Sequence, residues 1–419
     1  MARPSAAPPR PPSERAWVRA VLVVTVVAMV TVFAAWWEPR DGATTDIDLR
    51  NGRAFIQDNL WSTDAEQYAV WVDGSGHPIL GIREAAGSWR RTDLAAIEGN
   101  PLDAPTDDDS HNVYVVAVDS MGNVHVAGNM QSDPLRYIRT REPGSLDSWI
   151  EPPIGGANES VTYPAFVGLP DGTLLFLRRE GRRGIGGILA DRLAPGAEDW
   201  EHLGTLIDGR PSGEGPYLQH ASVDPADGSL HLGWLWRKGV GTVGNNDVSY
   251  MRSDDGGTTW RTSGGTALAL PVTHESAEVV FDTPDRGSGL LNHGGMVIDG
   301  AGRPHIVYSG RDQLLHLWFD GQQWHDAEPI LAFKGSRAAA ARAPDGSVWA
   351  VAARGARLVA VQIHPEVGSE VDGATVSRRW EPTYDSQAMQ RDDRLEVLLV
   401  PSSGDEPMVE SLALGSDES

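Results

Sequence analysis

Short apolar runs along the chain are separated by polar turns, and this arrangement returns about every fifty residues. Each copy has one apolar run, a tight turn that contains Asp or Gly, and a second apolar run, as in Val113–Asp119 and Gly122–Ala127. Such a pattern predicts pairs of short, half-buried β-strands. The copies cover residues 68–82, 113–127, 165–177, 221–235, 296–308 and 338–352, with a weaker one at Gln387–Arg391 and Leu395–Val400.

The spacing of these copies defines a repeat. The turn glycines fall at positions 76, 122, 172, 228, 302 and 346, so the long step from 228 to 302 must hold an insertion, which we expect near 263–289. A Trp late in each repeat recurs at positions 89, 149, 200, 260, 324 and 380. Seven repeats of four strands, with Trp on the outermost strand, predict an all-β fold, a seven-bladed β-propeller. A pair of β-sandwiches lacks such an even period, and a parallel β-helix has much shorter coils.

The amino-terminal segment predicts the compartment. An apolar run from Ala20 to Trp37 follows a short basic tail, and eighteen helical residues would be roughly 27 Å long, close to the hydrocarbon thickness of a membrane. The positive-inside rule leaves the tail in the cytoplasm and places the remaining chain outside. We therefore expect a single-pass signal anchor in the cell membrane. A cleaved signal peptide is the alternative, because Val32-Phe33-Ala34 loosely fits a cleavage site, and the protein would then be secreted.

The expected domain organisation follows from these two patterns. Its parts are a cytoplasmic basic tail (1–19), one N-terminal transmembrane helix (20–37), a linker (38–52), the propeller (53–412) and an acidic tail (413–419).

Composition excludes several classes of function. The formal net charge of −23 argues against a nucleic-acid partner, which requires a basic face. The chain has no Cys, so disulfides, thiolate zinc sites and Cys nucleophiles are excluded. The 12 His residues show no H-E-x-x-H motif and no tight cluster along the sequence, so we assign no metal, and a structural divalent ion lacks support. No Gly-rich phosphate loop precedes a helix, and we therefore expect no cofactor.

One segment fits the pattern S-x-D-x-G-x-T-W, known as the Asp-box or BNR repeat. Its residues are Ser253, Asp255, Gly257, Thr259 and Trp260. The Asp carboxylate can accept bonds from turn amides, Gly permits a left-handed turn, and Trp packs beneath. We interpret this segment as a structural staple on the outer edge of a blade, and not as a catalytic site.

The repeat geometry places other polar residues at one mouth of the propeller. Residues before the first strand of a repeat and residues after its second strand should converge there. The first set comprises His111, Tyr163, His220 and His293, and the second comprises Gln131, Arg179, Arg237, Arg311 and Arg354. Guanidinium groups bind carboxylate and sulfate through paired hydrogen bonds. We therefore expect the mouth to bind an anionic polysaccharide.

The chain resembles the BNR-repeat family of the sialidase-like propeller superfamily, whose members include seven-bladed lyases acting on ulvan. The matching segments are Asp109-Ser110-His111-Asn112, Gly128-Asn129-Met130, Pro134-Leu135-Arg136-Tyr137, Thr162-Tyr163-Pro164, Asn246-Asp247 and Gly302-Arg303-Pro304-His305-Ile306-Val307-Tyr308. The resemblance implies His111, Tyr163 and Arg179 as catalytic residues. The segment Gly128-Asn129-Met130 adds Asn129 to the substrate-binding residues expected from the repeat geometry, which are Gln131, His220, Arg237, His293 and Arg311. The family has a second His after Gly-Asn-Met, where this chain has Gln131.

Three functions remain open at this point. A polysaccharide lyase neutralises a uronate carboxylate, removes the C5 proton and protonates the leaving oxygen, which Arg179, His111 and Tyr163 could do. A glycan-binding or scaffold propeller would use the same mouth without turnover, in keeping with Gln131. A sialidase would need an Arg-Ile-Pro element in the first blade, where this chain reads Gly81-Ile82-Arg83-Glu84.

Overall fold

The computed structural model describes most of one compact unit, Thr45–Ser419. The described residues are 51–52, 58–84, 87–102, 109, 111–310, 313–331, 337–365, 367–376, 380–401 and 406–415. The basic tail and the predicted membrane segment, 1–37, lie outside them. Within these described ranges, no helix has both the length and the apolar character needed to cross a bilayer.

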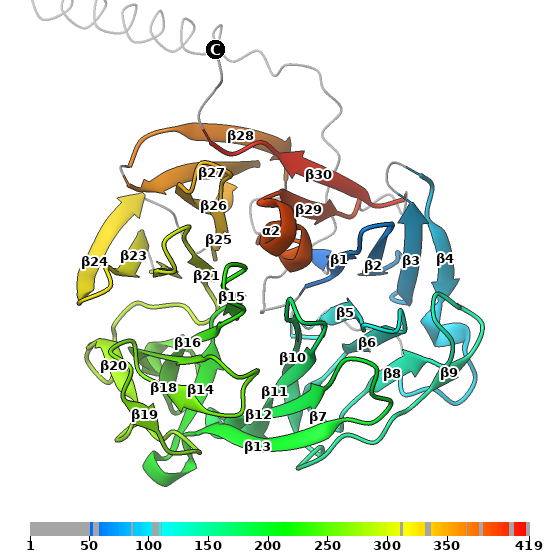
Figure 1. Cartoon of the computed structure of the whole chain (residues 1–419), viewed down its shortest axis with the longest axis horizontal. Coiled ribbons are helices and arrows are strands. Elements are labelled where there is room, and N and C mark those ends of the chain that lie inside the picture. Colours follow the sequence, from blue (N-terminus) through cyan, green and yellow to red (C-terminus); the bar gives the residue numbers. More distant parts are fainter. Residues whose placement is uncertain are drawn as a thin grey trace, which may run out of the picture. The chain divides into compact units, whose positions relative to one another are not determined.

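In the described part of the chain, the strands form seven antiparallel sheets set around a central axis (Figure 1). Five of them contain a run of four strands in simple up-and-down order, which is the regular unit of a propeller blade, and in one of these five, the sheet of β10–β13, the short strand β7 (Gln131–Asp133) is added at the edge. The first two are β1 (Leu60–Ser62), β2 (Glu66–Val72), β3 (Pro78–Glu84) and β4 (Arg90–Asp93), then β5 (Tyr114–Val118), β6 (Val124–Gly128), β8 (Tyr137–Thr140) and β9 (Trp149–Ile150). The third is β10 (Val161–Gly168), β11 (Leu174–Arg182), β12 (Ile185–Leu193) and β13 (Glu201–Asp208). The last two are β21 (Gly295–Ile298), β22 (Pro304–Ser309), β23 (Leu314–Phe319) and β24 (Trp324–Leu331), then β25 (Ala339–Arg342), β26 (Val348–Arg354), β27 (Arg357–His364) and β28 (Glu370–Thr375).

Two sheets depart from this plan. One has seven strands, because the predicted insertion near 263–289 adds two of them and the innermost strand is divided into two pieces that both pair with the second strand. Its strands are β14 (Glu214–Leu218), β15 (Ser222–Val223), β16 (Leu230–Lys238), β17 (Asn245–Ser253), β18 (Trp260–Arg261), β19 (Ala267–Leu268) and β20 (Glu278–Phe281). The other has two strands, β29 (Leu395–Leu399) and β30 (Met408–Leu412). The all-β propeller is thus confirmed, but the prediction of seven regular blades was wrong, because five are regular.

The two-stranded sheet is incomplete because a helix replaces a predicted strand. Gln387–Arg391 lies in α2 (Ser386–Asp392), next to the central axis (Figure 1). The carboxylate of Asp385 accepts the backbone N–H groups of Gln387 and Ala388, and Asp393 ends the helix in a left-handed conformation. Gln, Ala, Met and Arg are good helix formers, so this end-capped segment favours a helix over a strand.

The other predicted strand pairs are found. Two details differ from the prediction, the position of the first strand pair within its sheet and the position of one marker Trp. The first copy, residues 68–82, forms β2 and β3, so β1 lies inside it as an additional innermost strand. Trp380 is buried but lies outside the described strands, whereas the other five marker Trp residues begin or immediately precede an outer strand.

Apolar side chains between neighbouring sheets form the core. The first and last sheets meet through a cluster that includes Leu60, Trp71 and Leu398. The indole N–H of Trp89 donates to the carbonyl of Pro407 at 3.0 Å. Strand β1 pairs with β2 of its own sheet, so the described contacts close the ring by side-chain packing and hydrogen bonds such as this one.

Loops at strand ends position the site. After β6 the chain forms β7 (Gln131–Asp133), which pairs with β10 of the next sheet, with Gln131 opposite Thr162. Short 3₁₀ turns complete the fold at η2 (Leu94–Ala96), η3 (Arg210–Ser212) and η4 (Thr242–Gly244). The crossing loop places the amide of Gln131 beside the segment that carries Tyr163.

Candidate active site

Rings from four neighbouring sheets meet at one place. His111 precedes β5, Tyr163 lies in β10, Tyr217 lies in β14, and His293 precedes β21. The ring of Tyr163 is the centre of the group, with centroid distances of 5.8 Å to His111, 4.4 Å to His293 and 6.0 Å to Tyr217. We call these four residues the ring cluster.

Unusual backbone conformations present two members of this cluster. Tyr163 has φ +57° and His293 has φ +61°, a region that non-glycine residues rarely adopt. The pairing of β10 with β11 shifts register between Thr162 and Ala165, so Tyr163 lies in a bulge. Such conformations persist where the surrounding structure enforces them, and they concentrate at functional sites.

His111 is oriented by a carboxylate that the sequence prediction did not single out. Its Nδ1 lies 2.5 Å from Asp109 Oδ1, so Nδ1 carries the proton and donates to Asp109. Burial alone would raise the pKa of Asp109, but hydrogen bonds from the backbone and ring of His111 lower it. The side-chain nitrogen Nε2 of Gln131 lies 3.1 Å from the same nitrogen, and because an amide N–H group can only donate, it contacts the protonated Nδ1 without accepting its proton. This arrangement makes Nε2 the basic nitrogen of His111.

Burial fixes the protonation states of Tyr163 and His293, two other members of the ring cluster. Tyr163 is 6% exposed, and burial raises its pKa, an effect that the nearby cations Arg237 and Arg179 partly offset. Burial, together with the charge of Arg337, holds the pKa of His293 well below its ordinary value. His293 is thus a neutral imidazole whose Nδ1 donates to the carbonyl of Leu218 at 2.9 Å. Tyr163 is a protonated phenol, suited to donate a proton.

Two buried guanidinium groups flank the ring of Tyr217. Arg179 stacks 4.7 Å and Arg237 3.8 Å from its centroid. Arg237 donates to the side-chain carbonyls of Asn245 and Asn292, each at 2.6 Å. Arg179 makes two long contacts of 3.4 Å with backbone carbonyls, and its Nε is buried without a hydrogen-bond partner. No carboxylate among the described residues lies within 4 Å of either group.

The neighbouring Arg178 shows what a structural arginine looks like in this fold. It is fully buried and forms an ion pair with Asp191, which is also fully buried. Successive residues of a strand point to opposite faces, so Arg178 and Arg179 have different surroundings. Buried charges are ordinarily paired, and an uncompensated pair of cations therefore indicates a site for an anion.

Other predicted site residues lie apart from the ring cluster or lack a described contact with it. Asn129 is buried beside β6, with φ +58°. His220 pairs with Asp58 at 2.9 Å and stacks on Tyr384 near α2, so it does not join the cluster through any described contact. Burial alone would lower the pKa of His220, but Asp58 raises it. Arg311 lies outside the described residues. Arg354 is exposed and paired with Glu370, so it does not join a basic ring.

The Asp-box has the geometry of a hairpin staple. Asp255 accepts the backbone N–H of Thr259 at 2.8 Å and its hydroxyl at 2.7 Å, while Ser253 Oγ accepts the N–H of Gly257 at 2.9 Å. Gly257 has φ +87°, and the indole of Trp260 is buried and donates to the Gly257 carbonyl at 2.9 Å.

Several further aromatic and His side chains pack in the core away from the ring cluster. These are Trp234, Trp236, His125 and His231, all of them buried.

The sequence prediction missed four residues of this site. Asp109 was available from its position two residues before His111. Tyr217, Asn245 and Asn292 carried no motif, because their importance comes from contacts with Arg237 and Arg179. Among the described residues, no His, Asp or Glu group at the ring cluster is gathered closely enough to hold a metal ion.

The fold and site together define a β-propeller with two buried guanidinium groups beside a His–Tyr pair. The chain belongs to the BNR repeat-containing family, whose profile matches residues 66–329. It is 22% identical over 274 residues to an ulvan lyase of Alteromonas sp. (strain LOR), an alignment that covers 53% of each protein. The chain thus spans about half the length of this curated relative.

Solved structures show the same architecture. An ulvan lyase of polysaccharide lyase family PL25, bound to -[GlcA(1-4)Rha3S]-, superposes with a TM-score of 0.65 and 14% identity over 89% of this chain and 94% of that one. The polysaccharide lyase Uly1 gives the same TM-score and identity over 90% and 94%. At this identity the likeness shows the fold, a polysaccharide-lyase-like propeller.

Proposed function

We propose that this propeller binds an anionic polysaccharide at the ring cluster and cleaves it by β-elimination. The observation that carries the proposal is the pair Arg179 and Arg237, buried cations without a described carboxylate partner. A uronate carboxylate would supply the missing charge, and planar guanidinium groups suit its two oxygens. The relatives named above support a lyase-like propeller, and the PL25 lyase was solved with a glucuronate-containing ligand.

The chemistry divides among three kinds of residue. Arg179 and Arg237 would neutralise the carboxylate and thereby acidify the C5 proton. His111 Nε2 would take that proton, a C4=C5 double bond would form, and the C4–O4 bond would break. Tyr163 would give its phenolic proton to the leaving O4. The phenolate left on Tyr163 would be stabilised by the same two arginines, and proton return from His111 would reset the site.

The role of Gln131 follows from its contact with His111. An amide cannot exchange a proton near neutral pH, so the second His of the family has no chemical equivalent here. Gln131 contacts the His111 ring at Nδ1, whereas Asp109 orients the ring by accepting the Nδ1 proton. Under this proposal the acid–base pair is one His and one Tyr.

The test is a survey of uronate-rich polysaccharides with the full chain. We expect ultraviolet absorbance from the new double bond, and its loss in Tyr163→Phe, which removes the proton donor and keeps the ring. No product from any acidic glycan, across pH and with or without divalent ions, would reject the lyase. The variant Arg354→Ala is the matched control, because Arg354 is exposed and already paired with Glu370.

A non-catalytic glycan-binding propeller is the second candidate, favoured by Gln131 in place of the family His. It predicts binding of anionic oligosaccharides without product, abolished by Arg179→Ala. Binding and absorbance measured on the same preparation separate the two functions.

We further propose that residues 20–37 anchor the propeller outside the cytoplasm. Its support is the apolar run after a basic tail. Membrane fractionation of cells expressing the chain, followed by protease treatment of intact cells, tests the proposal. Recovery of an intact full-length chain in the soluble cytoplasmic fraction would overturn it.

A further inference from the structure

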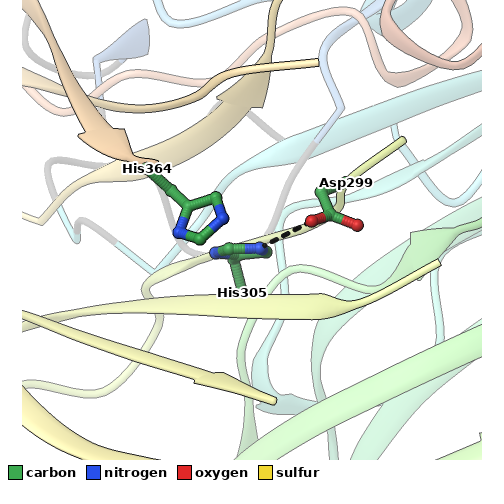
Figure 2. A group of neighbouring side chains, drawn as sticks. All are labelled: Asp299, His305 and His364. Atoms are coloured by element: carbon green, nitrogen blue, oxygen red, sulfur yellow. Dashed lines mark hydrogen bonds and ion pairs between the residues drawn. The ribbon is translucent and has the colours of Figure 1, made fainter. Parts of the chain in front are cut away.

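A second polar group lies where the sheet of β21–β24 meets the sheet of β25–β28 (Figure 2). Asp299 follows β21, His305 lies in β22, and His364 ends β27. One ligand atom from each of the three lies within 4.8 Å of the others. Asp299 and His305 are buried, whereas His364 is partly exposed. Sequence inspection showed no tight His cluster, because residues 305 and 364 are far apart in the chain.

Two of the three residues, Asp299 and His305, form a pair that also occurs in another blade. Asp299 Oδ1 accepts the backbone N–H groups of Ala301 and Arg303, each at 2.9 Å, and its Oδ2 faces His305 Nε2 at 3.3 Å. In the second sheet, Asp119 Oδ2 faces His125 Nε2 in the same way, at 3.1 Å. An Asp–His pair across the first turn is therefore a packing motif and indicates no ligand.

His364 distinguishes the Asp299–His305 pair from the Asp119–His125 pair of the second sheet. His364 comes from the adjacent sheet, and its ring centroid lies 4.7 Å from that of His305. The other nitrogen of His305, Nδ1, lies 2.9 Å from His316 Nε2. A metal-bound imidazole commonly donates its second N–H to such an acceptor, which fixes its tautomer. The second sheet has a Tyr137 hydroxyl at this position, 2.7 Å from His125.

A cationic nitrogen lies between these ligand atoms. Arg303 forms an ion pair with Asp299 Oδ2, and its NH2 lies 3.2 Å from His364 Nε2. A guanidinium group can only donate, so His364 Nε2 must be the unprotonated nitrogen. One carboxylate oxygen and one imidazole lone pair therefore converge on a positive charge. The Arg303 side chain is 30% exposed, so it has room to leave.

We propose that Asp299, His305 and His364 bind a divalent transition-metal ion of the zinc type, whose place Arg303 takes in its absence. Two imidazoles and one carboxylate are a common zinc ligand set, which leaves a fourth position for water. The ion would link two neighbouring sheets and would therefore stabilise the folded state. This inference is independent of the proposed function, because it concerns a separate group of residues.

The test uses the full chain, purified without a histidine tag and treated with chelator, and titrated with zinc chloride by calorimetry. We expect one site in the wild type. His364→Ala should weaken binding at least tenfold, and Arg303→Gln should tighten it, because the competing cation is gone. His325→Ala is the matched control, since His325 stacks on Trp318 nearby and lies outside the group of three ligands.

A second measurement guards against variants that fold poorly. Saturating zinc should raise the Tm of the wild type and of His325→Ala, and it should leave His364→Ala unchanged, because an ion bound to the folded state stabilises it. The proposal is overturned if neither the wild type nor Arg303→Gln shows saturable binding. It is equally overturned if His364→Ala retains wild-type affinity, or if His325→Ala loses as much affinity as His364→Ala.

Discussion

Two adjacent arginines should respond in opposite ways to the same substitution. Arg178→Ala leaves Asp191 fully buried without its main cation, and breaking a buried ion pair on one side costs about 3–5 kcal/mol. Arg179→Ala removes a buried cation that has no described carboxylate partner. The lost stacking on Tyr217, about 0.5–2 kcal/mol, is offset by the charge that no longer has to be desolvated. We therefore expect the unfolding free energy of Arg179→Ala to stay within about 1 kcal/mol of the wild type.

The affinity for a uronate oligosaccharide should rank the two variants in the reverse order, with Arg179→Ala the more strongly affected. Two hydrogen bonds from a charged guanidinium to a carboxylate contribute about 3 kcal/mol together, which is on the order of a 100-fold change in Kd. Arg179→Ala should weaken the binding of a uronate oligosaccharide by that factor. Arg178→Ala, measured where it remains folded, should bind nearly as well as the wild type.

The assay pairs urea denaturation, followed by Trp fluorescence, with calorimetric titration of the oligosaccharide. His111→Ala serves as the common background, so that turnover does not consume the ligand. Arg354→Ala, an exposed ion pair worth roughly 0–1 kcal/mol, should change neither quantity. The reasoning fails if Arg179→Ala loses as much stability as Arg178→Ala while its Kd stays within about twofold.

Three further predictions concern other parts of the molecule. His111→Ala should lower the cleavage rate at least roughly 100-fold, and Asp109→Asn should lower it at least roughly 10-fold. The Kd for the oligosaccharide should change little in both variants. A large rise in Kd without a loss of cleavage rate would instead assign both residues to binding. Asp255→Ala should lower the unfolding free energy by about 1–2 kcal/mol without affecting turnover, and a selective loss of turnover would contradict the staple. Burial raises the pKa of Asp385 from 3.8 to about 6, so its contribution to stability is full below about pH 4 and is lost as the pH rises through about 6. Asp385→Asn keeps the helix cap and should raise the unfolding free energy at pH 7.5 by up to about 3 kcal/mol, and an unchanged pH profile of unfolding would refute this origin.

Much of the fold could be predicted because its signals are local. An apolar run, a turn Gly with positive φ, and a second run specify a strand pair within about fifteen residues, and Gly122 and Gly172 illustrate this with φ +86° and +87°. The prediction failed at Gln387–Arg391, where the cap at Asp385 and good helix formers outweighed the repeat pattern. It also missed β1, which is too short to show a period.

The site was predictable only in part. His111, Tyr163, Gln131, Arg179, Arg237 and His293 do come into one connected group. His220 occupies an equivalent place in its repeat, but its described partners are Asp58 and Tyr384. Repeat position sets the end of the strand at which a residue lies, whereas its contacts depend on local backbone conformation and on neighbours from other sheets.

The sequence by itself determined most of the strand and turn pattern, the family, and which residue types lie at equivalent strand ends, because these depend on preferences acting over a few residues. Tertiary structure decided which charges are compensated. Arg178 and Arg179 are adjacent and chemically identical, and only the packing of neighbouring strands and sheets gives one a buried carboxylate and leaves the other beside Tyr217. Tertiary structure likewise brought His364 to Asp299 and His305, since contacts between adjacent sheets join residues that lie far apart along the chain.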